Sequence, residues 1–134
     1  MSDRQFVEQL CARPGMYGLN GTYHPTAMLL MGFDLARDGA LLRGFREWLT
    51  VRKGEPSSLV WYALVFQEAL PGVSLLNWGR LEPEQDLRAV DHLFSLVLEF
   101  LDVRDDADVL ARMYMEYHGL HALNGTADQG SRNP

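Results

Sequence analysis

The segment from His24 to Arg37 constrains the fold more than any other part of the chain, because its centre is an uninterrupted apolar run. Its centre, 27–33, reads Ala-Met-Leu-Leu-Met-Gly-Phe, and Pro25 is well placed as a first helical residue. A helix that is apolar all round is normally a buried one. The segment therefore predicts a central helix in a helical domain.

Apolar residues at helical spacing predict the other helices as well. Ser2 and Gln5 form a capping-box pattern for the first helix, and Ser57 or Ser58 can cap the fourth. Gly119 is expected to end the last helix. The expected segments are 2–12, 25–38, 41–52, 58–70, 83–103 and 106–119. We predict an all-α, single-domain bundle of five to six helices over residues 1–123, followed by a disordered tail, 124–134.

The longest predicted helix, 83–103, has two distinct faces. The apolar face is expected to enter the core and consists of Leu87, Val90, Leu93, Phe94, Val97, Leu98 and Leu101. The opposite arc is mostly charged and consists of Glu84, Arg88, Asp91, His92, Ser95, Glu99 and Asp102. Just beyond it, Asp105, Asp106 and Asp108 favour the start of the next helix through its dipole.

Charge is unevenly shared along the 134 residues, whose net charge is −6. Residues 1–67 hold seven Lys/Arg and six Asp/Glu (+1), whereas residues 68–134 hold five and twelve (−7). An acidic half repels nucleic-acid phosphates and suits a basic protein partner. The predicted partner-binding residues are Asp91, Glu99, Asp102, Asp105, Asp106 and Asp108, with Trp78 as an exposed loop anchor. The alternatives are a solvated acidic face and a loop tryptophan folded back over the bundle.

No residue pattern predicts catalysis, a metal site or a cofactor. His118 and His121 beside Glu116 have an admissible metal spacing, but Gly119 lies between them and no further ligand cluster follows, so a structural or exposed role is favoured. Asp91 and His92 are adjacent and point about 100° apart on a helix. The glycines accompany turns and helix ends and form no phosphate-binding loop.

Cys11 is the only cysteine, so an intrachain disulfide is excluded, and its position beside Leu10 predicts core packing. Trp48 and Trp61 fall among apolar residues at helical spacing and are predicted to be core. The chain shows neither a signal-peptide pattern nor an apolar run long enough to span a bilayer. We expect a cytoplasmic protein that binds no membrane.

A short motif joins the first two predicted helices and reads Arg13-Pro14-Gly15-Met16-Tyr17-Gly18. Proline and glycine favour a tight bend, and the Tyr17 side chain is expected to insert into the core. The motif is therefore predicted to have a structural role. It resembles a segment of the ATPase domain of type II topoisomerases. That fold also needs an Asp-x-Gly-x-Gly loop, which this chain lacks, so the ATPase reading is rejected.

A second resemblance extends over roughly residues 5 to 102. Its anchors are Arg13 to Tyr17, Gly32-Phe33, Phe45 to Trp48, Ser57-Ser58 before Trp61, and Phe94 to Asp102. In this order they resemble small bacterial helical proteins that act as immunity partners of polymorphic or contact-dependent toxins. The resemblance implies neutralisation of a cognate toxin by occlusion of its active or substrate surface.

Two other functions stay open at this point. The protein could be a self-associating structural or accessory subunit, and a homodimer fits that alternative. A small enzyme using His92 or the His118/His121 pair is the weaker one.

Overall fold

The computed structural model describes the backbone of residues 1–132 and the side chains of residues 1–122. Over this range the protein is all-helical and has no strand. Its α-helices are α1 (Asp3–Ala12), α2 (Tyr23–Ala36), α3 (Phe45–Lys53), α4 (Trp61–Ala69), α5 (Pro83–Arg104) and α6 (Ala107–Arg132), with two short 3-10 turns, η1 (Pro14–Tyr17) and η2 (Leu75–Asn77). The predicted all-α, single-domain bundle is confirmed.

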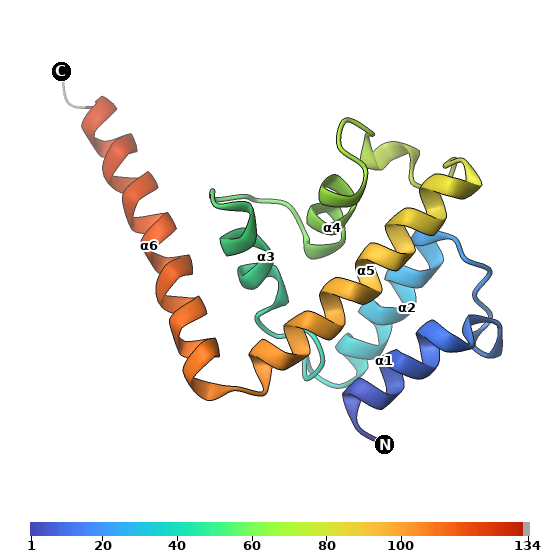
Figure 1. Ribbon diagram of the computed structural model, residues 1–134. Helices are drawn as coiled ribbons and strands as arrows, with labels where there is room; N and C mark the ends of the chain where they lie inside the picture. The colour runs from blue at the N-terminus through green and yellow to red at the C-terminus, as the bar shows by residue number, and fades with distance from the viewer. Residues whose placement is uncertain (133–134) are drawn as a thin grey trace.

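Helix α5 organises the bundle and runs diagonally through it in Figure 1. Helices α1, α2, α3 and α4 all pack against α5, and α6 turns back to lie along α3. The buried side of α5 carries Leu93, Val97, Phe100 and Leu101, each fully buried. Leu87 was predicted on this side, but it is 59% exposed, because the buried positions at this end of α5, Asp86, Ala89 and Val90, are centred about 100° around the helix from it.

Several helix boundaries follow local backbone chemistry. The Ser2–Gln5 capping box of α1 is confirmed. Helix α3 begins four residues later than predicted, because Gly44 takes a left-handed φ of +92° immediately before it. Helix α4 begins at Trp61 with no side-chain cap, since the Ser57 hydroxyl oxygen accepts a hydrogen bond from the Leu59 backbone N–H instead.

The last helix does not end at Gly119 as predicted, since α6 continues to Arg132. A single interior glycine costs a helix only about 1 kcal/mol and need not stop it. The side chains of the predicted tail, 124–134, lie outside the described residues, and its disorder stays a prediction.

Helix α2 differs most from its prediction. It packs against α5 through Tyr23, Thr26, Ala27 and Leu30, all buried. Its opposite side is covered only in part: Met28 and Leu29 are half-buried against the core, but Leu35 is 67% exposed. Helix α2 is therefore an edge helix, although its sequence predicts a central one.

The start of α2 is held by a carboxylate from α5. Asp86 is 9% exposed, and its Oδ1 accepts a hydrogen bond of 2.8 Å from the Tyr23 backbone N–H. The Tyr23 hydroxyl donates to the backbone carbonyl of Tyr62 on α4 at 2.6 Å, and burial raises the pKa of this hydroxyl. These two bonds tie α2, α4 and α5 together.

A second polar connection joins the other ends of three helices. Asp3 on α1 accepts from Arg37, just after α2, and from Arg104 Nη1 at the end of α5, the latter at 2.7 Å. Burial raises the pKa of the Asp3 carboxyl, but the two arginines outweigh burial, and the pKa lies below its ordinary value. The ionised carboxylate thus fastens α1 to the ends of α2 and α5.

Candidate partner-binding surfaces

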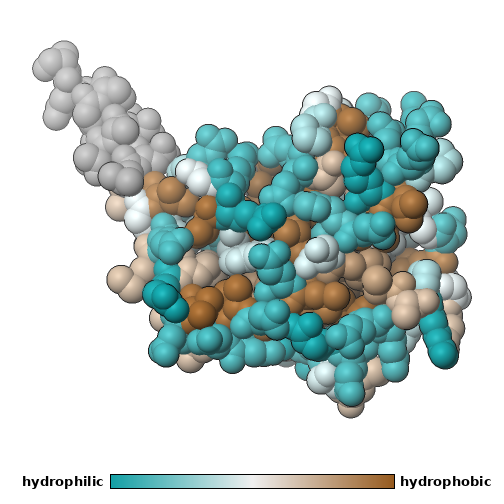
Figure 2. Space-filling view, in the orientation of Figure 1, coloured by the Kyte–Doolittle hydropathy of each residue, from teal (hydrophilic) through white to brown (hydrophobic). Residues whose placement is uncertain are grey.

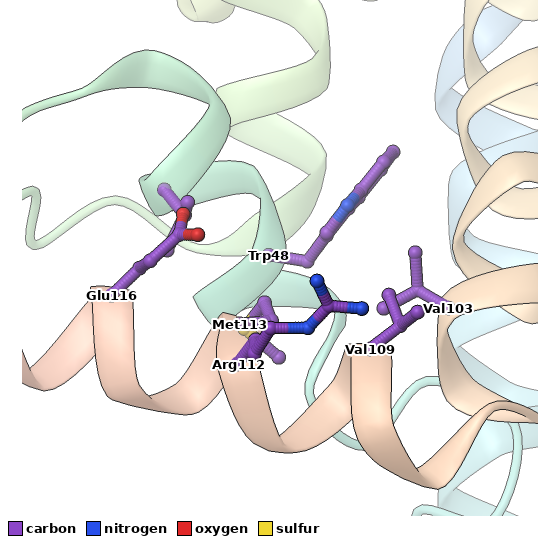
Figure 3. A pocket seen from close by; sticks show the side chains of 7 residues that line it. Trp48, Val103, Val109, Arg112, Met113 and Glu116 are labelled. Carbon is purple, nitrogen blue, oxygen red and sulfur yellow. The ribbon is translucent and has the colours of Figure 1, made fainter.

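An open cleft of about 280 Å³ lies between α3, the end of α5 and the first half of α6 (Figure 3). Its lining residues are Trp48, Val51, Val103, Val109, Arg112, Met113 and Glu116. The prediction that Trp48 and Trp61 are core is confirmed, since each is 9% exposed. Trp48 additionally forms part of the cleft wall, which helical spacing did not indicate.

A glycine allows α6 to approach α3 closely enough to form this cleft. A Cβ added at Gly44 would lie 2.8 Å from the Tyr114 hydroxyl oxygen and 3.5 Å from Phe100 Cζ. The position also has a φ of +92°, which L side chains rarely adopt. Burial raises the pKa of the Tyr114 hydroxyl, and the nearby Glu47 carboxylate adds to this effect.

The cleft has an apolar centre and a charged edge. In Figure 3, the Arg112 side chain extends toward Trp48 and Val103, and Glu116 lies toward the other end of the site. Figure 2 shows apolar side chains among hydrophilic ones on this side of the molecule. A centre of this kind with a polar rim is usual for protein–protein interfaces. At about 280 Å³, the cleft is slightly smaller than typical small-molecule sites of about 300–1,000 Å³, and it suits one or two inserted side chains of a protein partner.

The predicted acidic residues Asp105, Asp106 and Asp108 lie at one end of this cleft. Asp105 and Asp106 form the turn between α5 and α6, and Asp108 lies in the first turn of α6, so all three fall between Val103 and Val109, which line the cleft. Asp106 is occupied with capping α6, because its Oδ1 accepts from the backbone N–H groups of Asp108 and Val109 at 3.1 and 3.2 Å. Asp105 accepts from Arg104 at 2.9 Å. Asp108 makes no ion pair among the described residues and is exposed.

The predicted acidic residues on α5 have different partners. Asp102 pairs with Arg4 of α1, and Glu99 lies 3.9 Å from Arg52 of α3. Asp91 is exposed beside Cys11, whose thiol pKa is raised first by partial desolvation from neighbouring atoms and then by this carboxylate. Arginines from the neighbouring helices thus offset two of the three predicted charges.

Cys11 is exposed, contrary to the prediction that it packs in the core. On α1, Val7 and Leu10 point into the bundle, and the next position along the helix is rotated about 100° from Leu10.

His92 makes its ion pair with a residue of another helix and not with Asp91, its neighbour in sequence. It pairs with Glu68 of α4, which also accepts from Arg52 Nε at 2.7 Å. Burial raises the pKa of the Glu68 carboxyl, but His92 and Arg52 together lower it by more than burial raises it. The pKa therefore lies below its ordinary value. This arrangement joins α3, α4 and α5 across the surface and brings no nucleophile to His92.

Trp78 is half-buried in an aromatic stack. Its ring lies 3.9 Å from His24 and 5.3 Å from Tyr62, centroid to centroid, with interplanar angles of 13° and 22°. This geometry fits the alternative of a loop tryptophan folded against the bundle. A direct contact between Trp78 and a partner stays a prediction.

The Arg13 to Gly18 motif forms η1 with its two caps and packs less deeply than predicted. None of its residues is buried, and Met16 is 71% exposed. Tyr17 does not enter the core: it lies edge-on against Phe6, and its hydroxyl donates to Gln9 Oε1 at 3.2 Å. Tyr17 is thus half-buried against the edge of the core and not inserted into it.

His118 and His121 remain close together on α6, and His121 lies edge-on to Tyr117 at 4.5 Å. Within the part of the chain that the structure describes, no group of three or more His, Cys, Asp or Glu residues is arranged to hold a metal ion. None of the helices in that part is both long and apolar enough to cross a membrane.

Comparison with known proteins finds no matching family model, no matching curated protein and no matching solved structure. The fold and surface therefore define the class only as an all-α helical bundle, and the function must be argued from the surface itself.

Proposed function

We propose that this protein is a non-catalytic, immunity-type binding domain that neutralises a cognate toxin by occluding its active or substrate surface. One observation carries the proposal: an apolar cleft between α3 and α6 ends at an acidic turn. The resemblance to toxin-immunity proteins supports the same class.

The partner expected here is a basic protein. An apolar side chain of the toxin enters the cleft against Trp48 and Val109, while a neighbouring lysine or arginine meets Asp108. Of the predicted acidic residues, Asp91, Asp106 and Asp108 make no ion pair among the described side chains, and Asp106 is engaged in capping α6. A basic partner that meets Asp108 therefore displaces no internal arginine. The net charge of −6 speeds association with a basic surface, and salt weakens that effect.

The test uses the product of the gene next to this one as the binding partner, with calorimetry at low and high salt. Asp108→Lys should weaken binding about tenfold or more at low salt, equivalent to about 1.4 kcal/mol or more. Glu84→Lys is a matched control, since both residues are exposed acids in the first turn of a helix. Glu84 lies near the far end of α5, roughly 30 Å from the turn along the helix axis, and its reversal should change affinity less than twofold.

A second variant tests the apolar part of the surface. Val109→Ala should speed dissociation while leaving the association rate and its salt dependence nearly unchanged, because the side chain is uncharged. A neighbouring product that does not bind, or a complex that tolerates both Asp108→Lys and Val109→Ala, would overturn the proposal.

A further inference from the structure

The outer face of α2 is apolar from one end of the helix to the other. Its residues are Pro25, Met28, Leu29, Gly32, Leu35 and Ala36, of which Met28 and Leu29 are half-buried and the other four exposed. A helix at the edge of a bundle normally carries polar side chains on this side. A contiguous apolar face of this kind marks an interaction site.

The charged residues near the end of α2 do not cover this face. Asp34 Oδ1 accepts from the Leu42 backbone N–H at 2.7 Å. Arg37 pairs with Asp3, and its guanidinium lies over the Phe33 ring, 5.3 Å from the centroid. Both side chains are committed to contacts within the same molecule.

We propose that a second copy of this chain covers the face, with the two α2 helices packed antiparallel about a two-fold axis near Leu30. In this arrangement large residues lie opposite small ones. Met28 faces the partner's Gly32, and Leu35 faces the partner's Pro25, and the symmetry repeats each contact. A Cβ added at Gly32 meets nothing within 4 Å, so the space above this glycine is open for the partner's Met28.

Charge favours this face over others for self-association. Each copy carries −6, but the first 67 residues sum to only +1, and the face has no charged side chain. The end of α2 connects to the end of α5 through Asp3 and Arg104. Antiparallel packing therefore places the two acidic α5–α6 turns at opposite ends of the dimer and limits their repulsion.

The size of the face sets the strength of the dimer. A helix of 14 residues is about 21 Å long, and one such face buries less than the roughly 800 Å² per partner of a standard interface. The dimer should therefore dissociate at low concentration. The cleft is lined by residues of α3, α5 and α6, so dimerisation uses none of them.

The first experiment measures the mass of the full chain by sedimentation velocity across a wide range of concentration. The wild-type protein should pass from monomer to dimer, and Leu35→Glu should weaken the dimer about tenfold or more. Met115→Glu is a matched control, because Met115 is 73% exposed on α6 and does not belong to the α2 face. Far-UV circular dichroism verifies that both variants keep the helical fold.

The second experiment tests the antiparallel register by disulfide trapping in a Cys11→Ser background. Mixing Met28→Cys with Gly32→Cys should give a cross-linked heterodimer in higher yield than either variant alone. A protein that stays monomeric, or a dimer that Leu35→Glu leaves intact, would overturn the proposal. If the protein is monomeric and Leu35→Glu abolishes toxin binding, the face contacts the toxin. That result would likewise overturn the dimer.

Discussion

Replacing Gly44 with alanine tests how closely α6 is held to α3. The left-handed φ of +92° should cost an alanine about 1–2 kcal/mol. The added Cβ would also lie 2.8 Å from the Tyr114 hydroxyl oxygen, and moving that ring should cost about 1–3 kcal/mol more. The sum, about 2–5 kcal/mol, corresponds to a fall in Tm on the order of 10 °C for a chain of this length.

Thermal and urea unfolding followed by circular dichroism measure this loss. Gly72→Ala is the matched control, because Gly72 has a similar φ of +83° but nothing within 4 Å of an added Cβ. Its cost should be limited to the backbone strain, about 1–2 kcal/mol. Tyr114→Phe, which removes only the hydroxyl, should restore part of the stability in the Gly44→Ala background. Equal losses in Gly44→Ala and Gly72→Ala, with no recovery by Tyr114→Phe, would refute the close approach.

Three further changes test the polar and aromatic contacts. Asp86→Ala should destabilise the protein by about 1–3 kcal/mol in urea unfolding, because it leaves a buried backbone N–H of Tyr23 without its acceptor. Asp3→Asn should reduce the loss of stability on acidification: the wild-type carboxylate, whose folded pKa lies below the ordinary 3.8, contributes above that pH and is lost as the pH falls below it. Trp78→Ala should cost about 2 kcal/mol through loss of its ring stack, detectable as a lower Tm.

The helices were predictable because their information is local. The Ser2–Gln5 capping box and the apolar period of α5 each lie within a few turns of chain and need no knowledge of neighbours. The later start of α3 was missed because nothing in the sequence around Gly44, which lies between Arg43 and Phe45, shows that its φ is positive. Gly119 was wrongly predicted to end the last helix, because a glycine in the sequence does not show whether the backbone there is helical.

The exposure of α2 could not be predicted from its own composition. A helix that is apolar all round is expected to be buried on all sides, but sequence does not indicate how many neighbours will surround it. In this bundle α2 packs against α5 and leaves Leu35 and Gly32 uncovered. The proposed dimer accounts for this excess of apolar residues.

The neighbours of the acidic arc on α5 could not be predicted for a related reason. A helical wheel groups Asp91, Glu99 and Asp102 on one side, but it does not show which side chains other helices bring there. Arg4 reaches Asp102 from α1, and Arg52 lies 3.9 Å from Glu99. The carboxylate best placed to meet a partner is Asp108, whose neighbour Val109 lines the cleft.

The two proposed interfaces should act independently, because none of the α2 face residues lines the cleft. Mutations at well-separated sites without shared partners add within about 0.3–0.5 kcal/mol. Asp108→Lys should therefore weaken toxin binding and leave the dimer constant unchanged, whereas Leu35→Glu should do the reverse. The double variant should lose both properties by the same amounts as the single variants. A toxin affinity that depends on Leu35 would instead mean that the toxin contacts both copies or the α2 face itself, and the separation of the two surfaces argued above would be wrong.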